Sequence, residues 1–179
     1  MINGFNNAVV VGGGTMGSGI AQVFLESGAT LVLIEVDQRR ADSAAEQVKA
    51  GIRSKLIYEN NRTDGPQVEA KAAEILANFS TRVGLPAPSA AWSPDLVIES
   101  VFEDVEVKSD VLTQIETVYP ECPLVATNTS SLSINILSSR LLHSENFIGM
   151  HFFNPVPRHT TVVPDSGVSS SSGVISTRR

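Results

Sequence analysis

The sequence predicts an α/β fold in which helices cover a doubly wound parallel sheet. Short apolar runs of strand length alternate with longer segments whose apolar residues recur at helical spacing. The first apolar run ends in three glycines, and a helical pattern follows them directly. Several later apolar runs end in polar segments, at the edge where open α/β sheets bind their ligands. Together these observations favour a Rossmann-type domain.

The first strand–helix–strand unit occupies residues 8–34. We expect a buried strand at residues 8–11, a helix over residues 15–27 and a second buried strand at residues 31–34. Gly28 is a natural stop for the helix.

Two helical segments precede the next strand. Residues 38–58 and 67–77 carry helical patterns, and the turn-forming residues Asn60, Asp64 and Gly65 separate them. We expect a helical hairpin that stands out from the sheet.

The remaining residues continue the alternation of strands and helices. Further strands are expected at residues 79–83, 96–99, 124–127 and 147–153. Helices are expected at residues 105–119 and 133–142. The loop at residues 86–94 holds the one tryptophan.

Composition and charge narrow the class of protein. The 179 residues are 42% hydrophobic, which is typical of a globular chain that buries a core. The net charge of −6 argues against nucleic-acid binding, which needs a basic face. The longest apolar runs are strand-sized, so no membrane span is expected. The single cysteine, Cys122, is expected to be structural and fits a reducing, cytoplasmic location.

The spacing Gly12-x-Gly14-x-x-Gly17 between a strand and a helix predicts dinucleotide binding. Gly12 permits a tight turn, Gly14 lets a pyrophosphate approach the backbone, and Gly17 lets the helix press on the strand. The helix N-terminus adds free N–H donors and the positive end of its dipole. The alternative is a glycine-rich turn that holds no ligand.

Glu35 ends the second predicted strand, where an acid would accept hydrogen bonds from the adenosine ribose hydroxyls. A carboxylate there repels a 2′-phosphate, so the sequence predicts NAD rather than NADP as the cofactor. Arg39 and Arg40 are close in sequence and oppose this preference, unless they lie on a solvated helix face. No metal site is expected.

Three polar segments follow later strands. Glu99-Ser-Val-Phe-Glu103-Asp-Val-Glu-Val-Lys108 follows the fourth strand, Asn128-Thr-Ser-Ser the fifth, and His151-Phe-Phe-Asn154-Pro-Val-Pro the sixth. With the glycine segment, they make residues 5–158 resemble the L-3-hydroxyacyl-CoA dehydrogenase family, including 3-hydroxybutyryl-CoA dehydrogenases. In the related crystallin-like hydroxyacid dehydrogenases a proline usually follows the histidine, so Phe152 favours the acyl-CoA branch.

The resemblance implies roles for particular residues. His151 would be the general base that takes the proton of the 3-hydroxyl group while hydride passes to NAD, and an imidazole titrates near working pH. Ser130 would hydrogen-bond the substrate oxygen, and Asn154 would hold cofactor and substrate in register. Glu103 and Lys108 would line the nicotinamide end of the cofactor cleft. The implied substrate is an acyl-CoA.

Structural roles compete with these assignments. Ser130 could instead cap the helix that follows it. Glu103 could stabilise a helix start, and Lys108 could pair with Asp104 four residues earlier.

The predicted helical hairpin resembles the family's segment that meets the CoA nucleotide. Lys55 and Arg62 would offer positive charge to the phosphates there. The alternative is that both side chains are solvated, as most lysines and arginines on such helices are.

The sequence departs from the family after Pro157. The family has a glutamate about a dozen residues after the histidine, which orients the imidazole. Here Val163 occupies that position, and Asp165 lies two residues beyond it. We expect residues 1–158 to form the NAD-binding domain. We expect residues 159–179, including His159, to be a Ser-rich, disordered tail.

The family also continues with a helical domain that closes over the acyl chain and makes the dimer interface. Residues after Pro157 do not resemble it, so we expect a truncated or altered reading frame, or a gene fragment. A cleft without this wall would position substrate poorly, and weak or no turnover is expected. The apolar surface left without its second domain would favour self-association.

Two other functions compete with an acyl-CoA dehydrogenase. One is an NAD-binding module without catalysis, which Val163 favours and the presence of Ser130 and His151 opposes. The other is a hydroxyisobutyrate-type dehydrogenase, which shares the glycine segment. That enzyme would need a catalytic lysine in a later helix, and this sequence offers no such segment.

Overall fold

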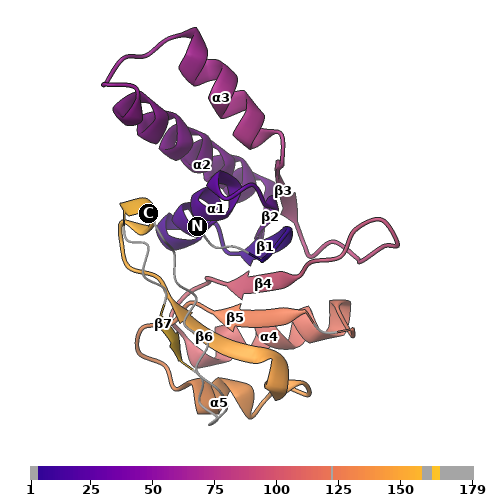
Figure 1. Ribbon diagram of the computed structural model, residues 1–179. Helices are drawn as coiled ribbons and strands as arrows, with labels where there is room; N and C mark the ends of the chain where they lie inside the picture. The colour runs from indigo at the N-terminus through magenta and orange to yellow at the C-terminus, as the bar shows by residue number, and fades with distance from the viewer. Residues whose placement is uncertain (1–3, 122, 159–162, 166–179) are drawn as a thin grey trace.

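The computed structural model describes residues 4–121, 123–158 and 163–165, and it confirms the doubly wound α/β class (Figure 1). The strands form one sheet in the order β3-β2-β1-β4-β5-β6-β7. Strands β1 to β6 are parallel, and β7 pairs antiparallel with β6 at the edge. The strands are β1 (Asn7–Val11), β2 (Thr30–Glu35), β3 (Phe79–Val83), β4 (Leu96–Glu99), β5 (Leu124–Thr127), β6 (Phe147–His151) and β7 (Val163–Asp165).

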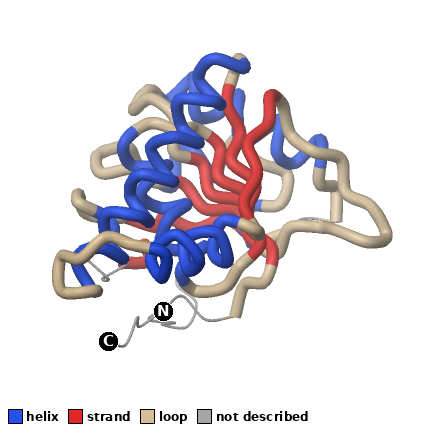
Figure 2. The backbone as a smooth tube through the Cα atoms, turned by 90° about the horizontal axis from the view of Figure 1, so that it is seen from above, coloured by secondary structure: helices blue, strands red, loops and turns tan. Residues whose placement is uncertain are grey.

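Helices lie on both faces of the sheet, and Figure 2 shows the strands as a twisted layer among them. The α-helices are α1 (Thr15–Glu26), α2 (Gln38–Glu59), α3 (Pro66–Leu76), α4 (Val105–Val118) and α5 (Ile134–Ser138). Two short 3₁₀ helices are η1 (Ser144–Asn146) and η2 (Val156–Arg158). None of the helices in the described part of the chain combines the length and apolar character needed to cross a membrane.

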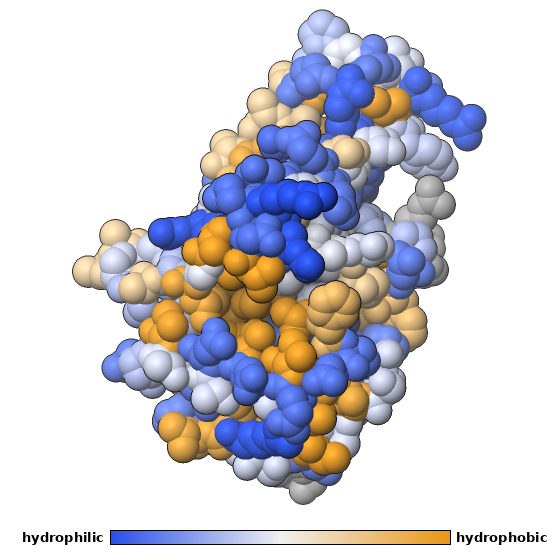
Figure 3. Space-filling model, turned by 180° about the vertical axis from the view of Figure 1, so that it is seen from behind, coloured by the Kyte–Doolittle hydropathy of each residue, from blue (hydrophilic) through white to orange (hydrophobic). Residues whose placement is uncertain are grey.

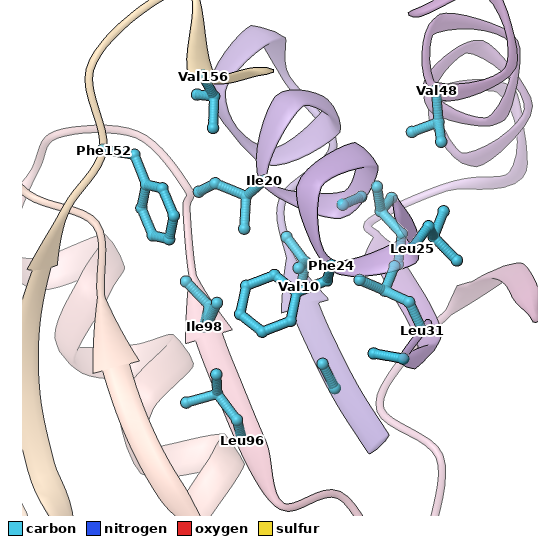
Figure 4. Close-up of a cluster of buried hydrophobic side chains, with 14 of the residues drawn as sticks. Val10, Ile20, Phe24, Leu25, Leu31, Val48, Leu96, Ile98, Phe152 and Val156 are labelled. Atoms are coloured by element: carbon cyan, nitrogen blue, oxygen red, sulfur yellow. The ribbon is translucent and has the colours of Figure 1, made fainter. Parts of the chain in front are cut away.

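Two hydrophobic cores lie on opposite faces of the sheet, because successive strand residues point to opposite sides. On one face, Val10 of β1 belongs to a cluster with Ile20 and Phe24 of α1 (Figure 4). On the other face, Val9 belongs to a cluster with Leu112 of α4. All five side chains are fully buried, so both cores fix the strands that end at the functional site.

Helices α2 and α3 form the predicted hairpin, which stands away from the sheet in Figure 1. Arg53 of α2 binds Asp64 in the connecting turn and Glu69 of α3, which ties the two helices together. Helices α1 and α2 also pack closely at Gly51, where a Cβ atom would lie 2.4 Å from the end of the Gln22 side chain.

Two predicted elements are shorter than expected. Helix α5 ends at Ser138 rather than at residue 142. The buried Glu116 carboxylate accepts hydrogen bonds from the backbone amides of Leu142 and His143, which holds that segment as a loop. Strand β6 ends at His151 rather than at residue 153.

Strand β7 lies within the segment predicted to be a disordered tail, and it corrects that prediction for residues 163–165 alone. Residues 163–165 pair with β6, with Val163 opposite His151 and Asp165 opposite Gly149. The rest of the predicted tail, including His159, lies outside the described residues, as does Cys122.

Candidate functional site

A cleft of about 660 Å³ opens at the carboxyl ends of strands β1, β2, β4, β5 and β6. This is the edge at which the sequence predicts the ligand site. Most of the predicted site residues line it: Gly12, Gly14, Glu35, Glu103, Ser130, His151 and Asn154. We call Gly12, Gly14, Gly17 and Glu35 the glycine end of the cleft, and Glu103, Ser130, His151 and Asn154 the histidine end.

The glycines after β1 are required by close backbone approach. Gly12 has a φ of +99°, and a Cβ atom there would lie 2.6 Å from the Ser100 carbonyl oxygen. A Cβ at Gly17 would lie 1.8 Å from the Gly12 carbonyl oxygen, so any side chain would separate α1 from the turn. Gly13, for which the sequence predicted no role, also lacks space for a side chain, because a Cβ atom there would lie 2.5 Å from the Ala44 Cβ.

Gly14 differs from its neighbours, because a Cβ there would meet nothing within 4 Å. Its missing side chain therefore leaves open space beside the first turn of α1. Among the described residues, the backbone amides of Thr15, Met16 and Gly17 donate to no protein acceptor. Unpaired amides and the positive end of the helix dipole fit an anionic group, so the turn can accept a pyrophosphate.

Glu35 lies at the end of β2 and lines the cleft, as predicted. Its carboxylate accepts hydrogen bonds from the Gly13 amide at 2.7 Å and from the Val36 amide at 3.1 Å. Arg40 also lines the cleft, and its Nε lies 3.6 Å from Asp37 Oδ2, whereas Arg39 is exposed outside the cleft. Of the two arginines that the sequence places near Glu35, only Arg40 lines the cleft.

Glu103 fixes the loop that follows β5. Its Oε1 accepts hydrogen bonds from Thr129 Oγ1 at 2.7 Å, from the Ser130 amide at 2.9 Å and from Ser131 Oγ at 3.0 Å. Burial raises the pKa of Glu103, but the bonds from Thr129 and Ser130, the charge of Lys108 and the bond from Ser131 outweigh it and lower the pKa to about 2. Glu103 is therefore ionised at neutral pH and holds Ser130 at the cleft.

Lys108 does not line the cleft, which corrects the prediction from the resemblance. Its side chain is fully buried beneath the cleft wall, and its Nζ lies 2.8 Å from Glu99 Oε1 and 3.4 Å from Glu103 Oε2. The alternative, a pair with Asp104, is not formed either, because Lys108 pairs with Glu99 and Glu103 while Asp104 caps α4 by accepting hydrogen bonds from two backbone amides. Ser130 does not cap α5 either, since the N-cap position is Ser133.

Glu99 is a buried residue of this site that the sequence interpretation missed as a functional candidate. It is the last residue of β4 and has no exposed surface. A charged residue that ends an otherwise apolar run, nine positions before a lysine, is the signal that could have identified it.

His151 ends β6 and is half-buried against Phe153, with ring centroids 4.4 Å apart. Among the side chains of residues 4–121 and 123–157, its imidazole has no hydrogen-bond partner, although Asn128 Oδ1 accepts a bond from the neighbouring Phe152 amide at 3.3 Å. Asn154 is exposed at the mouth of the cleft. The imidazole of His151 therefore faces a cleft that has room for a ligand.

Lys55 and Arg62 lie away from the cleft. Lys55 pairs with Glu26 of α1 and Glu59 of α2, and the Arg62 guanidinium lies 6.0 Å from the centre of the Tyr58 ring. Their contact with CoA phosphates stays a prediction. In the part of the chain that the structure describes, no cluster of three metal-ligating side chains occurs.

Apolar side chains also surround the cleft. Val36, Phe102, Val107 and Phe153 line it and are substantially exposed. Figure 3 shows hydrophobic residues gathered in the middle of one face of the molecule, with hydrophilic residues above and below. The site therefore combines an anion-binding turn with an apolar wall, which suits a dinucleotide with flat aromatic rings.

Comparison with known proteins agrees with this geometry. Residues 7–174 match the family model described as 3-hydroxyacyl-CoA dehydrogenase, NAD binding domain, so the match extends beyond the resemblance that ended at residue 158. The chain is 36% identical over 162 residues to the 3-hydroxybutyryl-CoA dehydrogenase of Clostridioides difficile, covering 90% of this chain and 54% of that protein. It is 34% identical over 154 residues to the mitochondrial hydroxyacyl-coenzyme A dehydrogenase of Sus scrofa, covering 84% and 47%.

Solved structures give the same result. The (S)-3-hydroxybutyryl-CoA dehydrogenase of Ralstonia eutropha matches with a TM-score of 0.77 and 32% identity, covering 90% of this chain and 54% of that one. The chain thus spans about half the length of the relatives it matches. Because the family model covers most of its residues, the chain belongs to the 3-hydroxyacyl-CoA dehydrogenase family through its NAD-binding domain, and its cofactor is NAD.

Proposed function

We propose that this domain takes part in the NAD-dependent oxidation of an (S)-3-hydroxyacyl-CoA to a 3-oxoacyl-CoA. The observation that carries the proposal is that the glycine end and the histidine end open into one cleft. The relatives named as 3-hydroxybutyryl-CoA and hydroxyacyl-coenzyme A dehydrogenases support this substrate class.

Different residues of the cleft would bind the cofactor and transfer the proton. The free amides at the start of α1 would hold the pyrophosphate, and Glu35 would accept hydrogen bonds from the adenosine ribose. When bound, NAD accepts the hydride. His151 would take the proton of the 3-hydroxyl group as a general base, since a neutral imidazole nitrogen carries a lone pair that can accept it.

Ser130 and Asn154 would position the substrate beside His151. The Ser130 hydroxyl lies 3.4 Å from Glu103 Oε1, a long hydrogen bond that a substrate oxygen could replace. Glu103 would keep the Ser130 backbone in place during this exchange, because it binds the Ser130 amide separately at 2.9 Å.

A comparison of His151→Gln with the parent chain tests the proposal. NADH affinity should stay within about twofold, whereas acetoacetyl-CoA reduction should fall at least about 100-fold, because the general acid–base group is lost. His143→Gln is the matched control, since His143 lies outside the cleft and is partly exposed. If the parent chain has measurable activity, a variant that reduces acetoacetyl-CoA equally fast would exclude His151 as the base.

One observation favours a second function, NAD binding without turnover. The register of β6 and β7 places Val163 opposite His151, at the position where the resemblance expects the orienting glutamate. Asp165 lies opposite Gly149 instead, so the backbone does not pair it with His151. Cross-strand partners lie close enough to interact, so a carboxylate at position 163 would be well placed to contact the imidazole.

The variant Val163→Glu separates the two functions. If the missing carboxylate limits catalysis, this change should raise acetoacetyl-CoA reduction at least about tenfold without changing NADH affinity. Val163→Gln controls for size without the charge. Reduction that is already fast in the parent chain and unchanged in both variants would eliminate the binding-only function.

We also propose self-association through the apolar side chains around the cleft, of which Phe102 and Phe153 are the largest. Sedimentation velocity should show a species larger than the monomer, and the fraction of protein in that species should fall when Phe153 is replaced by Ser. The single cysteine in the sequence supports a cytoplasmic location for the protein.

A further inference from the structure

The Glu99 carboxylate at the end of β4 is fully buried, and four hydrogen bonds satisfy it. Oε1 accepts from Lys108 Nζ at 2.8 Å and from the Val101 amide at 2.6 Å. Oε2 accepts from Lys108 Nζ at 3.0 Å and from Thr127 Oγ1 at 2.5 Å. The carboxylate therefore joins strand β4, strand β5, helix α4 and the loop after β4.

Lys108 carries this connection toward the cleft. Its fully buried ammonium lies 3.3 Å from the Asn128 carbonyl oxygen and 3.5 Å from the Val101 carbonyl oxygen, in addition to its contacts with Glu99. It also lies 3.4 Å from Glu103 Oε2. One cation thus touches two of the three segments that carry the histidine end, the loop after β4 and the loop after β5.

Through Glu103 and Asn128, this network extends to Ser130 and to the residue after His151. Glu103 binds the Ser130 amide, and Asn128 accepts a hydrogen bond from Phe152, the residue after His151. A displacement of Lys108 would therefore change the position of Ser130 and the support beneath His151. The glycine end lies next to this network only through backbone, because Val11 pairs with Glu99 and Gly12 packs on Ser100 and Val101. In the described part of the chain, no side-chain hydrogen bond of Glu99, Lys108 or Glu103 involves the glycine end.

We propose that Glu99 is a positioning residue for the histidine end of the cleft. A buried ion pair gives little net stability compared with an apolar pair of the same volume, but its hydrogen bonds fix the direction of every partner. Here those partners are the two loops that would hold the nicotinamide ring and the substrate. The proposal rests on the proposed function for the identity of that ligand.

Binding of NADH and ADP-ribose to Glu99→Gln tests this role. ADP-ribose keeps the pyrophosphate and adenosine but lacks nicotinamide, so it depends on the glycine end. We expect NADH affinity to fall about tenfold while ADP-ribose affinity changes less than about twofold. Amide hydrogen exchange should increase in residues 100–103 and 128–131 and stay unchanged in residues 12–17, with or without a ligand.

A second buried glutamate provides the matched control. Glu116→Gln weakens bonds to the Leu142 and His143 amides, which lie away from the cleft. It should therefore lower the melting temperature and change the affinities for NADH and ADP-ribose by the same small factor. If Glu99→Gln does not fold, Thr127→Val removes one bond to Glu99 and should give the same pattern on a smaller scale.

The outcomes separate this inference from the proposed function. Unchanged exchange in both loops, or an equal loss of the two ligands with no local change in exchange, would overturn the positioning role. If the parent chain binds neither ligand, the proposed cofactor function fails. In that case the exchange pattern alone decides whether Glu99 holds the two loops.

Discussion

The two ends of the cleft are built in different ways. The glycine end comes from one continuous stretch, residues 12–35, and its shape depends on backbone atoms that approach too closely for side chains. The histidine end gathers side chains from three distant segments, and the buried Glu99–Lys108 pair holds two of them. The first end is therefore sensitive to added atoms, and the second to lost charges.

The largest expected effect concerns a lost charge at the histidine end. Lys108→Met would leave the Glu99 carboxylate buried without its cation, which should lower the free energy of unfolding by about 3–5 kcal/mol. Urea unfolding followed by circular dichroism measures this loss. Lys71→Met, which removes an exposed pair with Glu74, is the control and should change stability by less than about 0.5 kcal/mol. Similar losses for both lysines would contradict the contrast between the two ends.

Added atoms at the glycine end should have the next largest effect. Gly17→Ala places a Cβ against the Gly12 carbonyl, so it should lower the free energy of unfolding by about 2–3 kcal/mol and abolish NADH binding. Gly14→Ala should leave stability within about 1 kcal/mol, because its Cβ meets open space, yet it should weaken NADH binding. Calorimetry and fluorescence titration check both variants. Equal destabilisation by the two would show that the turn is not packed as described.

The acid stability of the domain should depend on Glu103. Its pKa is lowered from 4.5 to about 2, so the stability it contributes is complete above pH 4.5 and is lost as the pH falls toward 2. A full shift would correspond to about 3 kcal/mol, but the side chain is 37% exposed, so solvent screening reduces the expected value to about 1–2 kcal/mol. Unfolding of the parent and of Glu103→Gln between pH 2 and pH 5 measures the difference, and parallel curves would argue against this role.

The smallest expected effect is a change of cofactor preference at the glycine end. Glu35→Gln removes the repulsion of a 2′-phosphate while Arg40 stays in the cleft, so NADPH affinity should rise about tenfold. Arg40→Gln added to Glu35→Gln should cancel this gain, whereas Arg39→Gln should not, because Arg39 lies outside the cleft. Titrations with NADH and NADPH distinguish these cases. A gain that survives the loss of Arg40 would exclude that arginine from phosphate binding.

The sequence was most informative where the backbone determines the structure. Strands β4 and β5 have the predicted bounds, because each is a run of three apolar residues that ends in a polar one. The glycine turn was also predictable, since its spacing follows from close approach rather than from distant partners. Strand β7 was missed because three residues within a serine-rich segment carry no periodic pattern.

Side-chain partners were harder to predict than backbone elements. The spacing of Asp104 and Lys108 suits a helical ion pair, yet Asp104 is used as a cap and Lys108 turns inward. A signal was present, because Lys108 shares the buried stripe of α4 with Leu112 and Ile115 at intervals of four and three residues. Its partner Glu99 lies on another strand, and only the folded sheet brings the two together.

Helix α1 links the two ends through its flank. A Cβ atom at Gly19 would lie 2.9 Å from the Val156 side chain, so the helix that begins at the glycine turn also supports the segment just after Asn154. Occupancy of the two ends is therefore subject to thermodynamic linkage. Any free energy by which an anion at the start of α1 favours substrate beside Asn154 must equal the free energy by which that substrate favours the anion.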